Sequence, residues 1–149
     1  MRAVVLHGPN KYSVEDVDLP DVGQEDVLVK INATSICPGT DRWVLSGDHP
    51  QPGYSAITYP VTLGHEICGE VVEVGDKITS FKKGDRVTSL PPLKPGGWAE
   101  YVATPAKGAL KIPETLSDEE GAIILCAGAT QVNAAINADI RLGDTVVVV

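Results

Sequence analysis

The triplet Gly64-His65-Glu66 places an imidazole beside a carboxylate, next to a glycine that favours a turn. A neutral imidazole nitrogen is the commonest side-chain ligand of protein-bound metals, and an adjacent acid can tune such a site. The same triplet also fits a histidine that has only a structural role in a strand. The triplet alone leaves both hypotheses open.

Three cysteines, Cys37, Cys68 and Cys126, are the other residues with ligand chemistry. Their odd number and wide spacing do not fit a disulfide scaffold and favour a reducing compartment. Cysteine is also among the most buried residue types. We expect Cys68, between Ile67 and Gly69, to pack in the core, and Cys126 could pack there as well.

Short β-rich runs separated by glycine and proline fill the first two thirds of the chain. They predict a barrel or a sandwich rather than a parallel sheet. The runs are Ala3–Leu6, Val27–Ile31, Lys30–Ile36, Val71–Val74 and Arg86–Thr88. Between them, Lys83-Gly84-Asp85 predicts a turn, and the proline-rich segment 91–97 predicts a loop.

The pattern becomes helical after Pro113. Ser117 and Glu120 have the spacing of a capping box, and the alanine-rich stretch 122–138 predicts a helix with a break near Gly128. The run 145–149 is almost entirely apolar, which is typical of a parallel strand buried on both faces. We expect one domain over residues 1–116, and over 117–149 a connecting helix and the first strand of a truncated second domain.

Composition excludes several classes of protein. The chain has 149 residues, of which 43% are hydrophobic, and this suits one globular core rather than a disordered chain. A formal net charge of −8 argues against nucleic acid and anionic lipid as partners. No apolar stretch approaches the roughly twenty residues of a membrane span. We expect a soluble, cytoplasmic protein.

A longer pattern around the triplet resembles a known family. Gly64-His65-Glu66-Ile67-Cys68-Gly69, followed by Gly75 and Ile78, resembles the zinc alcohol dehydrogenase signature of medium-chain dehydrogenases/reductases. The resemblance continues in 1–5, 26–30, 71–75, 83–87, 97–101 and 142–149. It implies a mainly β fold with some α, a GroES-like β-barrel truncated at the first strand of a Rossmann domain. The absent half would bind NAD or NADP, so no cofactor-binding residue is assigned here.

The resemblance also implies a site. One catalytic Zn²⁺ would be held by Cys37, His65 and Cys126, with a fourth position open. Hydride would pass from a zinc-bound alkoxide to nicotinamide, so the implied substrate is a small alcohol or polyol. Thr40 would relay the alcohol proton, and Glu66 would lie near the metal. The alternatives are a turn-capping threonine and a satisfied buried carboxylate.

The segment around Cys37 departs from the family pattern. The family usually has Cys, one residue, Ser or Thr, and then Asp, whereas Cys37-Pro38-Gly39-Thr40-Asp41 is one residue longer. Alignment on Thr40 and Asp41 places Pro38 at the ligand position, and alignment on Cys37 shifts the hydroxyl. Some zinc-poor relatives have Ser-Pro-Gly-Thr-Glu here, and Cys37 would then replace that serine. Asp41 could hold the second ring nitrogen of His65, or it could be a solvated turn residue.

Other features of the resemblance concern the whole enzyme. Residues 88–98 lack the cysteines of the structural-zinc lobe of many relatives, so we expect no structural zinc. Trp43, Tyr54 and Tyr59 could line a substrate pocket or lie in the core, and His7 and His49 are expected at the surface. The full-length protein is expected to be a homo-oligomeric, zinc-dependent alcohol dehydrogenase, and this chain alone is expected to be inactive. The alternatives are a zinc-free quinone or enoyl reductase and a non-catalytic GroES-like module.

Overall fold

A computed structural model of the chain describes residues 1–48, 57–90 and 96–148. His49, Tyr54, Pro91–Pro95 and Val149 lie outside these ranges, and so do the predictions made for them. The strands are β1 (Arg2–Gly8), β2 (Lys11–Asp16), β3 (Asp26–Ser35), β4 (Val61–Thr62), β5 (Glu66–Val74), β6 (Arg86–Ser89), β7 (Tyr101–Pro105) and β8 (Ala109–Lys111). The helices are α1 (Asp41–Ser46), α2 (Asp118–Ile123) and α3 (Ala129–Asn137), with a 3₁₀ turn η1 (Ala106–Gly108) and a π-helical segment η2 (Ile124–Gly128).

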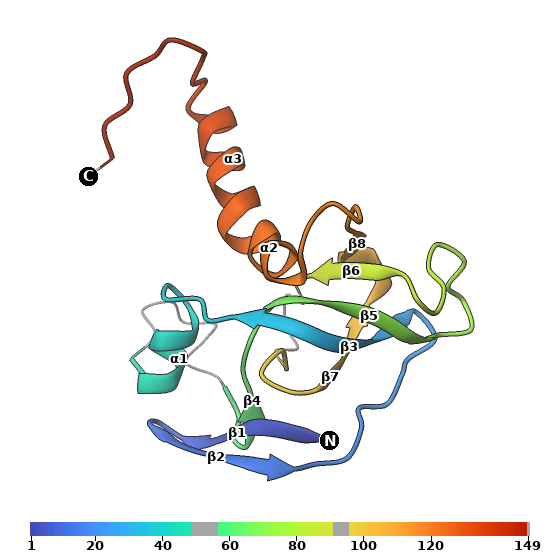
Figure 1. The fold of residues 1–149 in the computed structure, drawn as a ribbon. Coiled ribbons are helices and arrows are strands. Elements are labelled where there is room, and N and C mark those ends of the chain that lie inside the picture. The colour runs from blue at the N-terminus through green and yellow to red at the C-terminus, as the bar shows by residue number, and fades with distance from the viewer. Residues whose placement is uncertain (49–56, 91–95, 149) are drawn as a thin grey trace.

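The described strands form two antiparallel sheets. The larger sheet has the order β7-β3-β5-β6-β8, and the smaller has the order β2-β1-β4. A bridge between Ala3 and Ala99 links β1 to the segment before β7. Register shifts in the β3–β5 pair let these long strands bend, and Figure 1 shows the resulting curled sheet. The fold is the mainly β, GroES-like architecture that the sequence predicts.

Apolar residues of four strands build the main core. Val27 and Val29 of β3 are fully buried, and they pack with buried apolar residues of β5, β6 and β7. A second cluster around Leu6, Val44 and Leu63 joins β1 to α1. The predicted strand runs are therefore confirmed. In β3 the consecutive residues Val27, Leu28 and Val29 are all buried, so this part of the strand is covered on both faces.

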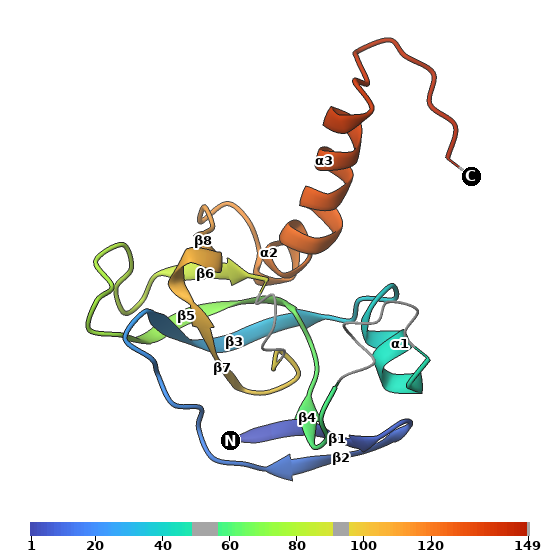
Figure 2. The same ribbon diagram turned by 180° about the vertical axis from the view of Figure 1, so that it is seen from behind.

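The connecting helix begins and is interrupted where the sequence predicts. The Ser117 side chain accepts a hydrogen bond from the Glu120 backbone, and Glu120 returns one to the Ser117 backbone, which confirms the capping box. The predicted break near Gly128 is present as the π-helical segment η2 between α2 and α3. Figure 2 shows from behind that α3 leads away from both sheets.

The strand expected over 145–149, as the first of a second domain, stays a prediction. Residues 145–148 have no strand pairing and are exposed. A strand exists only through hydrogen bonds to a neighbouring strand, and no described segment of the chain lies beside this one. Among the described residues, no helix is both long and apolar enough to cross a bilayer.

Candidate metal centre

The turn before β5 places His65. Gly64 has a φ of +96°, a region that favours glycine, and a Cβ there would lie 2.7 Å from the Trp98 backbone nitrogen. The Gly64 carbonyl accepts hydrogen bonds from the backbone N–H groups of Gly96 and Gly97, at 3.1 and 2.9 Å. The glycine of the triplet thus lets the chain pass close to the Trp98 segment.

A buried carboxylate orients the His65 ring. Asp41, the first residue of α1, is 3% exposed, and its Oδ1 lies 3.2 Å from His65 Nδ1. The second oxygen of Asp41 accepts a hydrogen bond from the Cys37 backbone at 2.9 Å. The predicted contact between Asp41 and His65 is therefore present. One carboxylate fixes both the imidazole and the cysteine loop.

The electrostatics of His65 follow from that contact. The hydrogen bond to Asp41 outweighs the opposing effect of burial and raises the pKa of His65 to about 9. Because Nδ1 is committed to Asp41, Nε2 is the nitrogen that faces the thiols. A cation that binds at Nε2 has to displace its proton, as metal binding to histidine generally does.

Cys37 lies in the short loop between β3 and α1 and is buried. The Asp41 backbone N–H donates to the Cys37 carbonyl at 2.9 Å and closes this loop into a turn. Burial alone would raise the pKa of the Cys37 thiol, but hydrogen bonds from Thr40 and Gly39 lower it below its ordinary value.

Thr40 occupies the N-cap position of α1, yet its side chain makes no capping hydrogen bond. The Thr40 side chain is instead among the groups that lower the pKa of the Cys37 thiol. The Thr40 side chain thus does not cap α1, and its role in proton relay stays a prediction.

Cys126 reaches the site from the π-helical segment. Its sulfur lies 3.7 Å from His65 Nε2 and 4.0 Å from the Cys37 sulfur. Burial, followed by the hydrogen bond to Glu66 and the charge of Cys37, raises the pKa of Cys126 to about 12. Glu66 is 4% exposed and completes a cluster in which one ligand atom each of Cys37, His65, Glu66 and Cys126 lies within 4.8 Å of the others.

The donor set matches the size of a tetrahedral zinc site. Zinc–sulfur and zinc–nitrogen bonds of about 2.3 and 2.1 Å give sulfur–sulfur and sulfur–nitrogen edges of about 3.8 and 3.6 Å. The corresponding separations here are 4.0 Å for Cys37–Cys126 and 3.7 Å for Cys126–His65. Two thiols and an imidazole are also the ligand types that Zn²⁺ prefers. The residues present therefore fit a zinc ion.

The remaining sequence candidates lie elsewhere. Cys68 is fully buried and packs as core, as predicted. Tyr59 packs against the cluster around Leu6, and half-buried Trp43 lies under the Arg42 guanidinium at 5.2 Å. Sequence inspection missed Asp118, although its pairing with Arg86 ties α2 to β6 at 2.6 Å. Only the position of Asp118 just after the capping serine could have drawn attention to it.

Comparison with known proteins places the fold in a family. Residues 23–114 match the model of the alcohol dehydrogenase GroES-like domain. The chain belongs to the zinc-type alcohol dehydrogenase family. It is 34% identical to L-threonine 3-dehydrogenase of Marinomonas sp. (strain MWYL1), over 79% of this chain and 41% of that protein. It is 31% identical to sorbitol dehydrogenase of Bombyx mori, over 98% and 48%. The chain thus spans less than half the length of these relatives.

Solved structures of family relatives share the fold. Quinone oxidoreductase of Coxiella burnetii has a TM-score of 0.87 at 27% identity, over 97% of this chain and 47% of that one. A proposed zinc-binding dehydrogenase of Sinorhizobium meliloti 1021, solved with NADP, has a TM-score of 0.71 at 38% identity, over 82% and 41%. The 2R,3R-butanediol dehydrogenase of Bacillus subtilis has a TM-score of 0.70 at 31% identity, over 83% and 43%.

Proposed function

We propose that this chain is the zinc-binding catalytic domain of an NAD(P)-dependent alcohol or polyol dehydrogenase. The observation that supports it most is the convergence of Cys37, His65 and Cys126, which come from three distant segments of the family fold. Their separations fit one metal ion. The names of three relatives, L-threonine, sorbitol and butanediol dehydrogenases, all denote alcohols with a second polar group. We assign a substrate of that kind to this chain.

The roles of the residues follow from their positions. The Cys37 and Cys126 sulfurs and His65 Nε2 would hold Zn²⁺ and leave one position for substrate. A zinc ion supplies a Lewis acid that polarises the oxygen of an alcohol. Asp41 keeps the His65 ring in the tautomer that presents Nε2 to the site.

Two further residues, Thr40 and Glu66, would transfer a proton and contribute charge near the site. The Thr40 hydroxyl can accept a proton from the substrate hydroxyl and donate its own onward, because a hydroxyl both donates and accepts. Its place beside the Cys37 sulfur supports this role. Glu66 stays within the same cluster as a buried acid behind the metal position.

The proposal extends to the organisation of the whole enzyme. Residues 1–116 form the GroES-like catalytic domain, and 117–149 lead into a nucleotide-binding domain that supplies NAD or NADP. The relative from Sinorhizobium meliloti was solved with NADP bound. Three free cysteines suit a reducing, cytoplasmic setting.

A zinc-free reductase of the quinone type is the second candidate. The likeness to the Coxiella burnetii quinone oxidoreductase, at a TM-score of 0.87, favours it. In that case the thiols and the imidazole would be structural neighbours without a metal. The two candidates make opposite predictions for the metal content of the purified chain.

Zinc stoichiometry tests the proposal. We expect close to one zinc per chain by elemental analysis, and loss of that zinc in both His65→Ala and Cys37→Ser. His7→Ala is the matched control, since His7 is exposed and pairs with Glu15 on the other sheet. A folded chain without zinc would contradict the proposal and favour the quinone-reductase candidate.

A further inference from the structure

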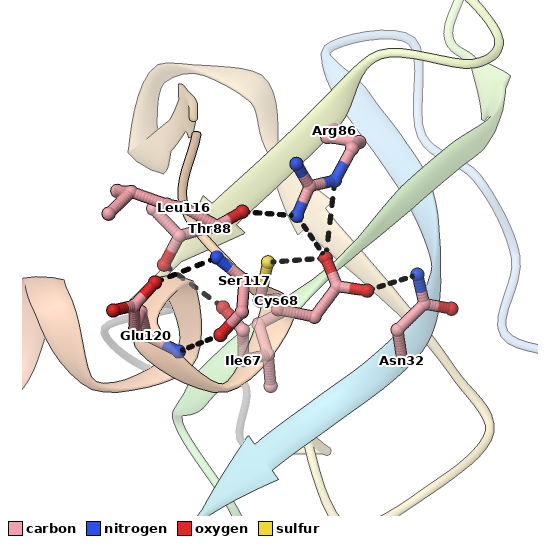
Figure 3. A network of polar contacts seen from close by, with 9 residues as sticks. Asn32, Ile67, Cys68, Arg86, Thr88, Leu116, Ser117 and Glu120 are labelled. Carbon is pink, nitrogen blue, oxygen red and sulfur yellow. Dashed lines mark hydrogen bonds and ion pairs between the residues drawn. The ribbon is translucent and has the colours of Figure 1, made fainter. Parts of the chain in front are cut away.

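Asp118, the first residue of α2, joins three strands of the larger sheet. Its Oδ1 accepts hydrogen bonds from Arg86 of β6, at 2.6 Å from Nη2 and 3.2 Å from Nε. The Cys68 thiol of β5 donates to the same oxygen at 3.6 Å, and Asn32 of β3 donates to Oδ2 at 3.0 Å. Figure 3 shows Arg86, Cys68 and Asn32 converging on this one carboxylate. The start of α2 is therefore fixed to the sheet.

The next turn of α2 packs too closely on β5 to move inward. A Cβ at Gly121 would lie 2.7 Å from the Cys68 sulfur and 3.0 Å from Ile112 Cδ1. Ala122 is 2% exposed and packs in the same small cluster as Cys68 and Ile112. Because Gly121 has no side chain, α2 can pack this closely on β5. The hydrogen bonds of the Asp118 carboxylate set the orientation of α2.

This anchored turn leads directly to Cys126. The helix continues from α2 into η2, which contains Cys126, five residues after Gly121. On the C-terminal side of η2, α3 buries none of its residues in the described chain. The cysteine is thus held chiefly from the α2 side. A rotation of α2 would carry its sulfur away from His65.

We propose that Asp118 is a positioning residue for the metal centre. Through α2 it holds the Cys126 sulfur within reach of His65 Nε2 and the Cys37 sulfur. This inference rests on the proposed function, because it assumes that Cys126 is a metal ligand. Asp118 itself does not belong to the metal-ligand cluster.

Cobalt(II) substitution of the metal-free chain tests this role. Thiolate ligands give Co²⁺ an intense near-ultraviolet charge-transfer band, whose strength reports the number of cobalt–sulfur bonds. We expect Asp118→Asn to raise the Kd for Co²⁺ at least about tenfold. We also expect Asp118→Asn to lower the intensity of this band per bound Co²⁺ to about half, because Cys126 would no longer ligate the ion whereas Cys37 would. Gly121→Ala should have the same two effects.

Glu100→Gln is the matched control. Glu100 accepts hydrogen bonds from the Arg2 backbone and Nε, far from α2, so its loss removes a comparable carboxylate–arginine contact. This variant should bind Co²⁺ like the parent chain. If Asp118→Asn fails to fold by circular dichroism, Asn32→Ala removes one of its partners and should raise the Kd about two- to threefold.

The outcomes separate the two proposals. A folded Asp118→Asn chain with parental affinity and band intensity would overturn the positioning role, even if its melting temperature fell. Parental Co²⁺ binding by Asn32→Ala would overturn it in the same way if Asp118→Asn does not fold. A parent chain that gives no sulfur band would instead overturn the proposed function, and the inference with it.

Discussion

At the scale of single residues, Asp41 contacts two of the candidate ligands, although it is not a member of the ligand cluster itself. One of its oxygens contacts His65 Nδ1, and the other accepts a hydrogen bond from the Cys37 backbone. Loss of a side chain that orients a metal ligand in this way typically weakens metal binding by roughly 10- to 100-fold.

Asp41→Asn should therefore weaken zinc binding about tenfold, because the amide removes the charge that stabilises the ring orientation. Competition with a chromophoric chelator measures the change. Asp48→Asn is the control, since Asp48 is exposed just beyond α1. Equal zinc affinity of the Asp41→Asn and parent chains would contradict the role of Asp41.

Two glycines with similar backbone angles give a paired test of the His65 turn. Gly64→Ala should lower the free energy of unfolding by about 3 kcal/mol or more, because the new Cβ meets the Trp98 segment in a strained conformation. Gly84→Ala should cost only about 1 kcal/mol, since φ is +88° but nothing lies within 4 Å. Urea unfolding compares the two, and equal losses would contradict the close packing at Gly64.

The sequence predicted the candidate ligands of the site better than the residues that position them. His65, Cys37 and Cys126 were singled out by residue type and by resemblance, and the structure brings them together. The roles of Asp118 and Gly121 depend on contacts between α2 and β5. No local pattern predicts such contacts, because the partners lie about fifty residues apart in the chain.

At the scale of secondary structure, periodicity predicted the long strands and missed the short or exposed ones. Apolar β-rich runs revealed β3 and β5. The strand β2 has only two apolar residues, Tyr12 and Val14, in a short alternation that gave a weak signal, and it is largely exposed. The capping box set the start of α2 correctly. The apolar run 145–148 is exposed and unpaired. The strand expected there stays a prediction, because β structure needs a partner strand.

The Arg86–Asp118 ion pair makes the docking of α2 dependent on pH. Hydrogen bonds from Arg86 lower the pKa of Asp118 below its ordinary 3.8. The stabilisation is therefore complete above that value and is lost as pH falls through the lower pKa of the folded state. Asp118→Asn should reduce the free energy of unfolding by about 1–2 kcal/mol at pH 7.

Urea unfolding of the metal-free parent and variant, from pH 7 to pH 2, checks this dependence. The difference between the two chains should shrink as the pH falls below 4, because the parent then also loses its charge at Asp118. A difference that stays constant over the whole range would contradict the ion-pair contribution.

At the scale of the whole molecule, α3 and the sheets differ in how much they bury. Val132 and Ile136 are 60% and 70% exposed, whereas Ile67 of β5 is completely buried. Both views of the fold show α3 extending away from the sheets. The stability of the described chain is thus expected to come from the sheets and α2.

Ile136→Ser should change the free energy of unfolding by no more than about 0.5 kcal/mol. Ile67→Ala should cost about 2–5 kcal/mol, because it removes buried methyl groups and leaves a cavity. Thermal or urea denaturation of both variants makes the comparison. A large loss in Ile136→Ser would show that α3 packs on the rest of the chain in solution.

The most direct test of the central claim is the ligand shell of a zinc ion bound to this chain. X-ray absorption at the zinc edge should find two sulfurs at about 2.3 Å and at least one nitrogen at about 2.0–2.1 Å. Cys126→Ser should leave one sulfur in the shell. A shell with no sulfur, or one that Cys126→Ser leaves unchanged, would contradict the assignment of Cys37, His65 and Cys126 as the metal centre.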